Sequence, residues 1–196
     1  MRILLLFFLL VGSVEASDPR KELEKSESWL LTSVSCPADL MARNPAKVKY
    51  DTSSCANNLS FCLAMCNKEK VNYCYNAAQE VQRLELAEYE RYAEALFVRS
   101  CRLGSASGCT NSAATNQNRK GTIDFTCAAR TYKKSCDWGD PWGCTMYGSH
   151  LAHGKGVAKD LDAALVALSK SCKHGEDDPA CVNAKSITKQ IIQAKE

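Results

Sequence analysis

The stretch PWGCTMYGSHLAHGKGVAKDLDAALVALSKSC, residues 141–172, decides the fold, because it joins a helical pattern to one period of a cysteine repeat. Within it, Leu161, Leu165 and Leu168 follow one another at i, i+4 and i+7, with alanines in the same stripe. That spacing places apolar side chains on one face of an amphipathic helix. The helix ends at Cys172, which lies 28 residues after Cys144.

Outward from this stretch, the cysteines recur with a fixed period. Four of them step by 35, 35 and 36 residues, and each is followed by a second cysteine after 8, 8, 8 and 9 residues. The pairs are Cys66 and Cys74, Cys101 and Cys109, Cys136 and Cys144, and Cys172 and Cys181. A period in the mid-thirties is typical of helical-hairpin solenoids, whose units bury their apolar faces by stacking. We therefore predict an all-α, right-handed superhelix of about four hairpins in residues 59–196, with residues 17–58 as an N-terminal capping helix and loop.

Geometry favours a disulfide within each of these four pairs. Eight residues of straight helix span about 12 Å, whereas a disulfide needs Cα atoms about 4.4 to 6.8 Å apart. A chain reversal between the cysteines removes this conflict, and three units carry a glycine three residues after the first cysteine, at Gly104, Gly139 and Gly175. Each bridge should contribute about 2.5 kcal/mol in the chain-entropy model.

Four cysteines fall outside the paired period: Cys36, Cys55, Cys62 and Cys127. Three complete pairings are open to them, and we favour Cys36 with Cys55, which would tie down a long loop over residues 43–57. Cys62 and Cys127 each occupy a helix column that other units fill with packed side chains, so packing explains them as well as bonding does.

Composition excludes several classes of protein. The chain has 196 residues, of which 45% are hydrophobic and 24% charged, and this indicates a folded domain. The net charge of +3 gives no reason to expect nucleic acid or an anionic membrane as the partner. Twelve cysteines point to an oxidising compartment.

The first residues set that compartment. Arg2 precedes an apolar run over residues 3–11, and small residues follow up to Ala16. This pattern predicts a cleaved secretory signal in residues 1–16, because the run has about half the length needed to cross a bilayer. We expect a secreted or periplasmic protein without a membrane span.

The chain resembles the Sel1-like repeat proteins, in the cysteine-rich branch typified by the Helicobacter cysteine-rich proteins. Residues 141–172 resemble a complete unit, with Gly148, Gly154, Gly156 and Cys172 on the family pattern. Residues 79–86 and 115–121 lack the glycine loop of that unit. The resemblance implies a binding repeat and, since some members are described as such, a weak β-lactamase or penicillin-binding activity as the alternative.

No catalytic or metal constellation emerges from the residues. Ser186 and Lys189 fit S-x-x-K, but S-D-N and K-T-G are both absent, so we do not expect Ser186 to be a nucleophile. The three histidines, His150, His153 and His174, do not form a metal-ligand pattern, and no cofactor is expected.

Aromatic side chains offer the best candidates for contact with a partner. Trp138 and Trp142 flank one hairpin turn, where they either cover the neighbouring disulfide or anchor a peptide. The first helices of their units carry Tyr73, Tyr75 and Tyr147, which invite the same two interpretations. We expect a non-enzymatic module that binds a protein, a peptide or a cell-wall component along its concave face.

Overall fold

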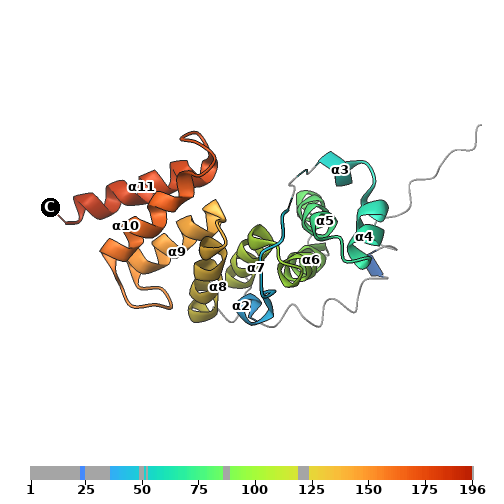
Figure 1. Ribbon diagram of the computed structural model, residues 1–196, viewed down its shortest axis with the longest axis horizontal. Helices are drawn as coiled ribbons and strands as arrows, with labels where there is room; N and C mark the ends of the chain where they lie inside the picture. The colour runs from blue at the N-terminus through green and yellow to red at the C-terminus, as the bar shows by residue number, and fades with distance from the viewer. Residues whose placement is uncertain are drawn as a thin grey trace, which may run out of the picture.

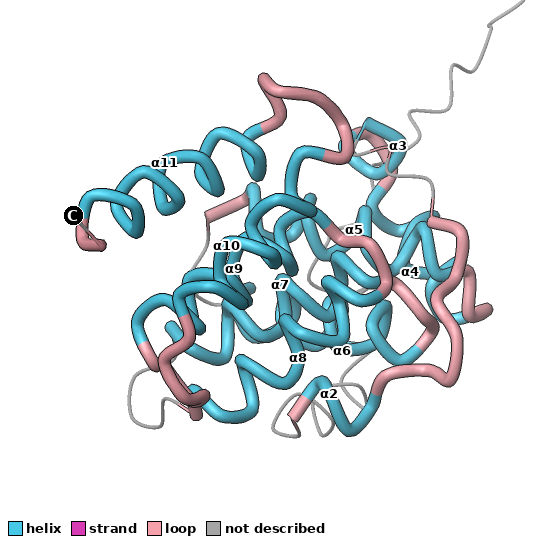
Figure 2. The backbone as a smooth tube through the Cα atoms, turned by 60° about the vertical axis from the view of Figure 1, so that its left-hand side comes forward, coloured by secondary structure: helices cyan, strands magenta, loops and turns pink. Residues whose placement is uncertain are grey.

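The computed structural model describes residues 23–24, 36–48, 51, 53–85, 89–118 and 124–195, and these contain helices and connections without a β-strand (Figures 1 and 2). The predicted leader, residues 1–16, lies outside the described residues. None of the helices in the described ranges is both long and apolar enough to cross a membrane.

Four hairpins follow one another along the chain. The helices pair as α4 (Leu59–Asn67) with α5 (Val71–Arg83), α6 (Glu90–Arg102) with α7 (Ala106–Asn118), α8 (Phe125–Asp137) with α9 (Pro141–His153), and α10 (Leu161–Ser169) with α11 (Pro179–Gln193). A short 3-10 turn, η3 (Lys170–Cys172), extends α10. Each helix contacts the next one in the chain, which is the arrangement of a solenoid and confirms the predicted fold class.

Local sequence explains where these helices begin. Asp124, Asp140, Asp160 and Asp178 precede α8, α9, α10 and α11, and each carboxylate accepts a hydrogen bond from a backbone N–H of the first turn. Such caps satisfy donors that the helix itself leaves unpaired. Pro141 and Pro179 stand at the first helical position, where the missing N–H costs nothing.

A disulfide closes every hairpin. The bridges are Cys66–Cys74, Cys101–Cys109, Cys136–Cys144 and Cys172–Cys181, with Cα atoms 4.4 to 4.6 Å apart. These are the same four pairs that the spacing predicts. In three hairpins the turn is made by a glycine with positive φ: Gly104 at 101°, Gly139 at 82° and Gly175 at 113°.

Glycine also permits the close approach of the two helices beside the bridge. A Cβ atom at Gly143 would lie 2.8 Å from Ser135 Cβ and 3.0 Å from Cys136 N. Since real Cβ atoms do not approach so closely, a larger side chain would force the helix ends apart. The first hairpin differs at its turn, because Glu69 takes the left-handed position there with φ of 59°.

The glycine loop after α9 packs against the start of α8. A Cβ atom at Gly156, whose φ is 69°, would lie 2.0 Å from the carbonyl oxygen of Phe125. The two earlier connections between hairpins lack this loop in sequence, as noted above. The contact therefore belongs to the junction between the third and fourth hairpins.

Residues 36–48, which we call the strap, begin at α2 (Pro37–Leu40) and then cross the α6–α7 turn at Gly104. The one helix of the strap, α2, contacts α6, α7 and α8, and Figure 1 shows it at the lower edge of the molecule beside α8. The strap is fastened by Cys36–Cys127. A second short helix, α3 (Ser53–Ala56), packs on α4 and α5 and is fastened by Cys55–Cys62.

The predicted Cys36–Cys55 bridge is therefore wrong. The loop expected over residues 43–57 contains α3, which brings Cys55 beside Cys62 on the first hairpin, whereas Cys36 lies at the third hairpin. Docking of α2 against α8 brings Cys36 to Cys127 instead, across 91 residues of sequence. The last helix, α11, begins at Pro179 and continues to Gln193, so it is the second helix of the fourth hairpin.

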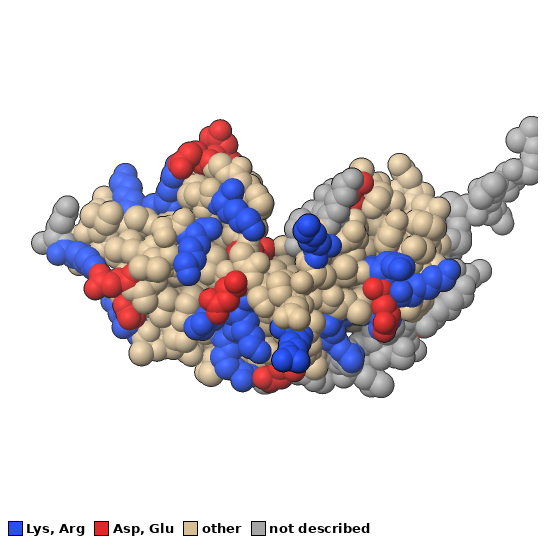
Figure 3. Space-filling view, in the orientation of Figure 1, with Lys and Arg blue, Asp and Glu red and all other residues tan. Residues whose placement is uncertain are grey.

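The stacked hairpins form a curved body with its core between the two helix layers. The largest wholly buried side chains include Phe97, Tyr132, Leu63, Leu96 and Leu168. The second helices contact one another along the inner side, α7 with α9 and α9 with α11. Figure 3 shows the surface hollowed at the upper edge, between α9 and α11 on one side and α3 and α5 on the other, as located in Figure 1.

Candidate binding face

The inner face is formed by the second helix of each hairpin, α5, α7, α9 and α11. Its geometry is fixed by a polar contact that recurs from hairpin to hairpin. In each of the first three units, the residue after the second cysteine is Tyr75, Thr110 or Thr145, and its hydroxyl contacts the following unit. These side chains are buried, so their hydroxyls must find partners within the protein.

The first of these contacts joins α5 to α7. The Tyr75 hydroxyl accepts hydrogen bonds from Gln79 Nε2 at 2.9 Å and from Asn111 Nδ2 at 3.4 Å. Asn111 Nδ2 also lies 2.9 Å from the Ser107 carbonyl oxygen, one turn earlier on α7. The Tyr75 ring packs on Phe97, with ring centroids 5.9 Å apart.

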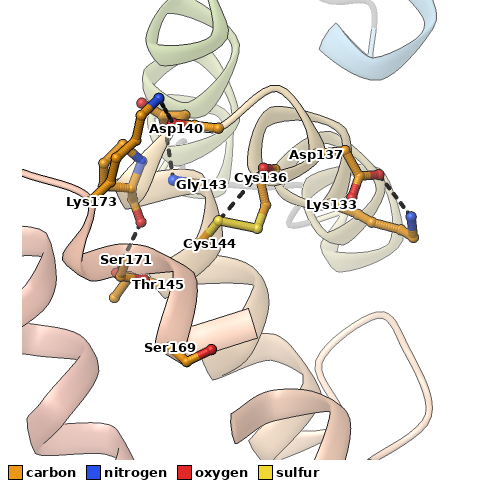
Figure 4. Close-up of a disulfide and its surroundings, with 12 residues drawn as sticks. Lys133, Cys136, Asp137, Asp140, Gly143, Cys144, Thr145, Ser169, Ser171 and Lys173 are labelled. Atoms are coloured by element: carbon orange, nitrogen blue, oxygen red, sulfur yellow. Dashed lines mark hydrogen bonds and ion pairs between the residues drawn. A yellow bond between two sulfur atoms is a disulfide. The ribbon is translucent and has the colours of Figure 1, made fainter. Parts of the chain in front are cut away.

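The second contact joins α7 to α9 through a buried carboxylate. Asp140 accepts hydrogen bonds from Ser107 Oγ and Thr110 Oγ1, both at 2.6 Å, and from the backbone N–H of Gly143 at 2.8 Å (Figure 4). Charge-assisted bonds of this kind are stronger than neutral ones. Asp140 is 5% exposed, so the cap of α9 also serves as the anchor of α7.

The third contact joins α9 to the fourth hairpin. Thr145 Oγ1 lies 3.0 Å from the Ala180 carbonyl oxygen and 2.9 Å from Ser171 Oγ, and Figure 4 shows it between the two bridged helices and η3. The three contacts hold α5, α7, α9 and α11 in a fixed relative position. A signal for them exists in the sequence, because Tyr75, Thr110 and Thr145 share one position of the period, but that column was not recognised.

Charge is distributed unevenly between the two layers. The inner helices α7 and α9 contain no Asp, Glu, Lys or Arg, whereas α6 contains five such residues and α8 contains four. Figure 3 shows lysines and arginines along the lower edge and also on both sides of the hollow. The central helices of the inner face, α7 and α9, therefore offer hydroxyl, amide and aromatic groups without Asp, Glu, Lys or Arg, whereas α5 carries Glu80 and Arg83 and α11 carries Lys185 and Lys189.

Trp142 is the most exposed of the predicted aromatic candidates. It is 42% exposed at the start of α9, and Met146, half-buried, follows one turn later on the same helix. Trp138 is half-buried at the end of α8. Tyr75 is buried, Tyr147 is half-buried against the core of the fourth hairpin, and Tyr73 packs edge-on against Phe61 at 5.5 Å.

The histidines are separated by the fold. His150 is buried between the rings of Phe125 and Tyr132, and its Nδ1 lies 2.7 Å from the Lys155 carbonyl oxygen. Burial lowers the pKa of His150, and it raises the pKa of the Tyr132 hydroxyl. His153 is exposed on α9, and His174 is exposed after η3.

The residues of the S-x-x-K match do not form an enclosed site. Ser186 and Lys189 are both exposed on α11, and within the described residues no hydrogen bond joins them. An acylating serine needs a base within hydrogen-bonding reach and donors for the oxyanion. One metal-like cluster occurs among the described residues, at Cys172, Glu176 and Cys181, but its two cysteines are joined to each other and offer no thiolate.

Comparison with known proteins finds similarity among solved structures. No family model matches the chain, and no curated protein matches it. Among solved structures, the chain is similar to the Helicobacter pylori cysteine rich protein B (hcpB), with a TM-score of 0.45 and 25% sequence identity, over 67% of this chain and 93% of that chain.

Proposed function

We propose that this disulfide-rich helical repeat is a secreted or periplasmic binding module that holds an extended, uncharged peptide segment of a partner protein on its inner face. The observation that carries the proposal is the absence of charged residues from α7 and α9, beside outer helices that are rich in them. A charged partner would lose its hydration there without gaining a counter-charge.

The side chains of this face suit a peptide backbone. Asn111 on α7 and Asn183 on α11 donate from Nδ2 to the Ser107 and Pro179 carbonyl oxygens, and their Oδ1 atoms can accept hydrogen bonds from peptide N–H groups. Trp142 supplies an exposed aromatic surface, the kind of side chain that most often dominates binding energy. Because the three buried contacts between hairpins fix the spacing of the helices, little ordering is required on binding.

The test measures binding of synthetic peptides to the oxidised full chain. Three extended peptide sets of equal length, one neutral, one acidic and one basic, are compared with cell-wall oligosaccharides. We expect the neutral peptides to bind, with an affinity that changes less than about twofold between about 50 and 500 mM salt, because no ion pair is screened. Selective binding of the oligosaccharides or of a charged set would overturn the proposal.

Two variants locate the site. Trp142→Ala should weaken peptide binding at least about tenfold, as expected for an aromatic anchor. Phe61→Ala, which removes a similarly exposed aromatic from α4 on the outer layer, should leave binding unchanged.

A separate assay tests the alternative activity. Hydrolysis of a chromogenic cephalosporin by the unaltered chain above the level of a Ser186→Ala variant would contradict the proposal, since it would establish a β-lactamase activity.

A further inference from the structure

Among the six disulfides, two include a cysteine that is not fully buried. Cys36 and Cys172 are half-buried, whereas the other ten cysteines are buried. The bridges Cys36–Cys127 and Cys172–Cys181 are therefore the two that a reductant in solution can reach most directly. Accessibility is the first requirement for thiol–disulfide exchange.

The two accessible bridges differ in the charge beside them. Arg130 Nη2 lies 3.4 Å from Cys36 Sγ, and the same guanidinium pairs with Asp39 at 3.0 Å. Beside the other bridge, a carboxylate oxygen of Glu176 lies within 4.8 Å of both sulfur atoms, and this carboxylate pairs with Lys185. A cation attracts an attacking thiolate and stabilises a departing one, and an anion does the opposite.

The strap held by Cys36–Cys127 has few other attachments. Its backbone is bound by Ala38 N to Thr131 Oγ1 at 3.1 Å, by Lys134 Nζ to the Ala38 carbonyl oxygen at 2.8 Å, and by Ala46 N to the Gly104 carbonyl oxygen at 2.9 Å. The Asp39–Arg130 pair is more than half exposed on both sides, and such pairs contribute little. Pro37 and Ala38 are its buried residues, and both are small.

We propose that Cys36–Cys127 is a redox-sensitive latch, which a small dithiol opens before the other five bridges and which then releases the strap from α6 and α8. One thiolate of the dithiol attacks Cys36 Sγ, and Cys127 leaves as a thiolate. The second thiolate then attacks the mixed disulfide, and Cys36 leaves as a thiolate beside Arg130. The dithiol is oxidised to its cyclic disulfide, and the two electrons pass to the two cysteines.

Release of the strap has a consequence for a second bridge. The Pro37 carbonyl oxygen lies 3.8 Å from Cys101 Sγ, so the strap covers the Cys101–Cys109 bridge. Once the latch is open, this bridge becomes more accessible to the dithiol. The Cys66–Cys74 bridge, which the strap does not contact in this way, keeps its protection.

The experiment follows each bridge separately. The oxidised full chain is exposed to dithiothreitol, the thiols are alkylated at intervals, and peptides are quantified by mass spectrometry. We expect Cys36–Cys127 to open at least about tenfold faster than Cys66–Cys74 and faster than Cys172–Cys181. Trypsin cleavage after the exposed Arg43 should accelerate with latch opening, while the helical circular dichroism is retained. Equal rates for all bridges, or loss of helix together with latch opening, would overturn the proposal.

Charge variants separate the cause from simple loosening. Arg130→Gln should slow latch opening several-fold, although it also removes an attachment of the strap. Asp39→Asn removes the same ion pair but keeps the guanidinium beside the sulfur, so latch opening should be unchanged or faster.

Two further variants test the other bridges. Glu176→Gln should accelerate opening of Cys172–Cys181. In a Cys36→Ala/Cys127→Ala variant, Cys101–Cys109 should react faster and Cys66–Cys74 should not. An Arg130→Gln rate equal to that of the unaltered chain would refute the role of charge.

Discussion

The repeat hairpins of residues 59–193 and the strap of residues 36–48 are both fastened by disulfides, but the bridges differ in span. Each hairpin bridge joins cysteines 8 or 9 residues apart, whereas Cys36–Cys127 spans 91 residues. Within a hairpin, helix geometry and a turn residue bring the sulfurs together. For the strap, the docking of a distant segment does so. The position of each short bridge therefore depends on the local hairpin, whereas the position of the long bridge depends on the docking of a segment that is distant in sequence.

The largest expected difference between the two regions concerns stability. In the chain-entropy model, a loop of about 90 residues gives about 4.5 kcal/mol and one of about nine residues about 2.5 kcal/mol. We expect Cys36→Ala/Cys127→Ala to lower the free energy of unfolding by about 2 kcal/mol more than Cys101→Ala/Cys109→Ala does. Urea unfolding of both variants, monitored by circular dichroism, measures the difference.

Burial of the Cys101–Cys109 bridge affects this comparison of unfolding free energies. Cys101 and Cys109 are wholly buried, so their replacement also leaves a small cavity, which narrows the difference between the variants. A larger loss for the hairpin variant than for the strap variant would mean that packing around the sulfurs outweighs chain entropy. The comparison of local and long bridges would then need a different physical basis.

Docking of the strap on the second hairpin can be tested at one turn residue. A Cβ atom at Gly104 would lie 2.8 Å from Ala46 N and 3.2 Å from the Asn44 carbonyl oxygen, whereas one at Gly175 meets nothing within 4 Å. Both glycines have φ above 100°, so alanine suffers a comparable backbone strain at either position. We expect Gly104→Ala to destabilise by about 2 kcal/mol more than Gly175→Ala, by thermal unfolding.

Equal losses at Gly104 and Gly175 would mean that the strap shifts without cost. The strap would then be held by its disulfide and by the hydrogen bonds of Ala38 with Thr131 and Lys134. A larger loss at Gly104 would instead show that the contact with the α6–α7 turn contributes to the position of the strap.

The sequence predicted the hairpins because their determinants lie close together in the chain. Gly139, Asp140 and Pro141 specify a turn, a cap and a helix start within three residues, and Cys136 and Cys144 flank them. Cys127 lies in the first turn of α8, where Asp124 caps the helix, but no chain reversal separates it from a second cysteine nearby in the sequence. Its partner is chosen by the contacts of α2 with α6 and α8, and such contacts leave no fixed spacing in the sequence.

On the inner face too, the features that depend on nearby residues were predictable and those that depend on the next hairpin were not. The exposed Trp142 was recognisable beside its turn, because local sequence marks a hairpin end. The contacts of Tyr75 and Thr110 were not recognised, although they recur with the period, because their partners Asn111 and Asp140 lie in the next unit. Residue types at a repeated position suggest a shared role only when the stacking geometry is known.

A smaller effect is expected at the turn of the first hairpin, where the repeat departs from its own pattern. Glu69 has φ of 59°, at the position that glycine occupies in the other three hairpins. Glu69→Gly should therefore stabilise the chain by about 1 kcal/mol, since the strain of a left-handed side chain is removed. Lys70→Gly, next to it with φ of −81°, should destabilise instead, and urea unfolding distinguishes the two.

The smallest effect is a dependence on pH that belongs to the repeats rather than the strap. Burial between Phe125 and Tyr132 lowers the pKa of His150 from its ordinary value of 6.5. Between the two values the unfolded chain binds the proton and the folded chain does not, so this contribution to stability is complete above pH 6.5 and declines as the pH falls below it. His150→Gln should reduce the slope of unfolding free energy against pH in this range by at most about 1.4 kcal/mol per pH unit, the value for one proton. The exposed His153, changed to Gln, is the matched control. A slope that persists in His150→Gln would assign the acid sensitivity to another group, whereas its loss would assign that sensitivity to His150 in the third hairpin.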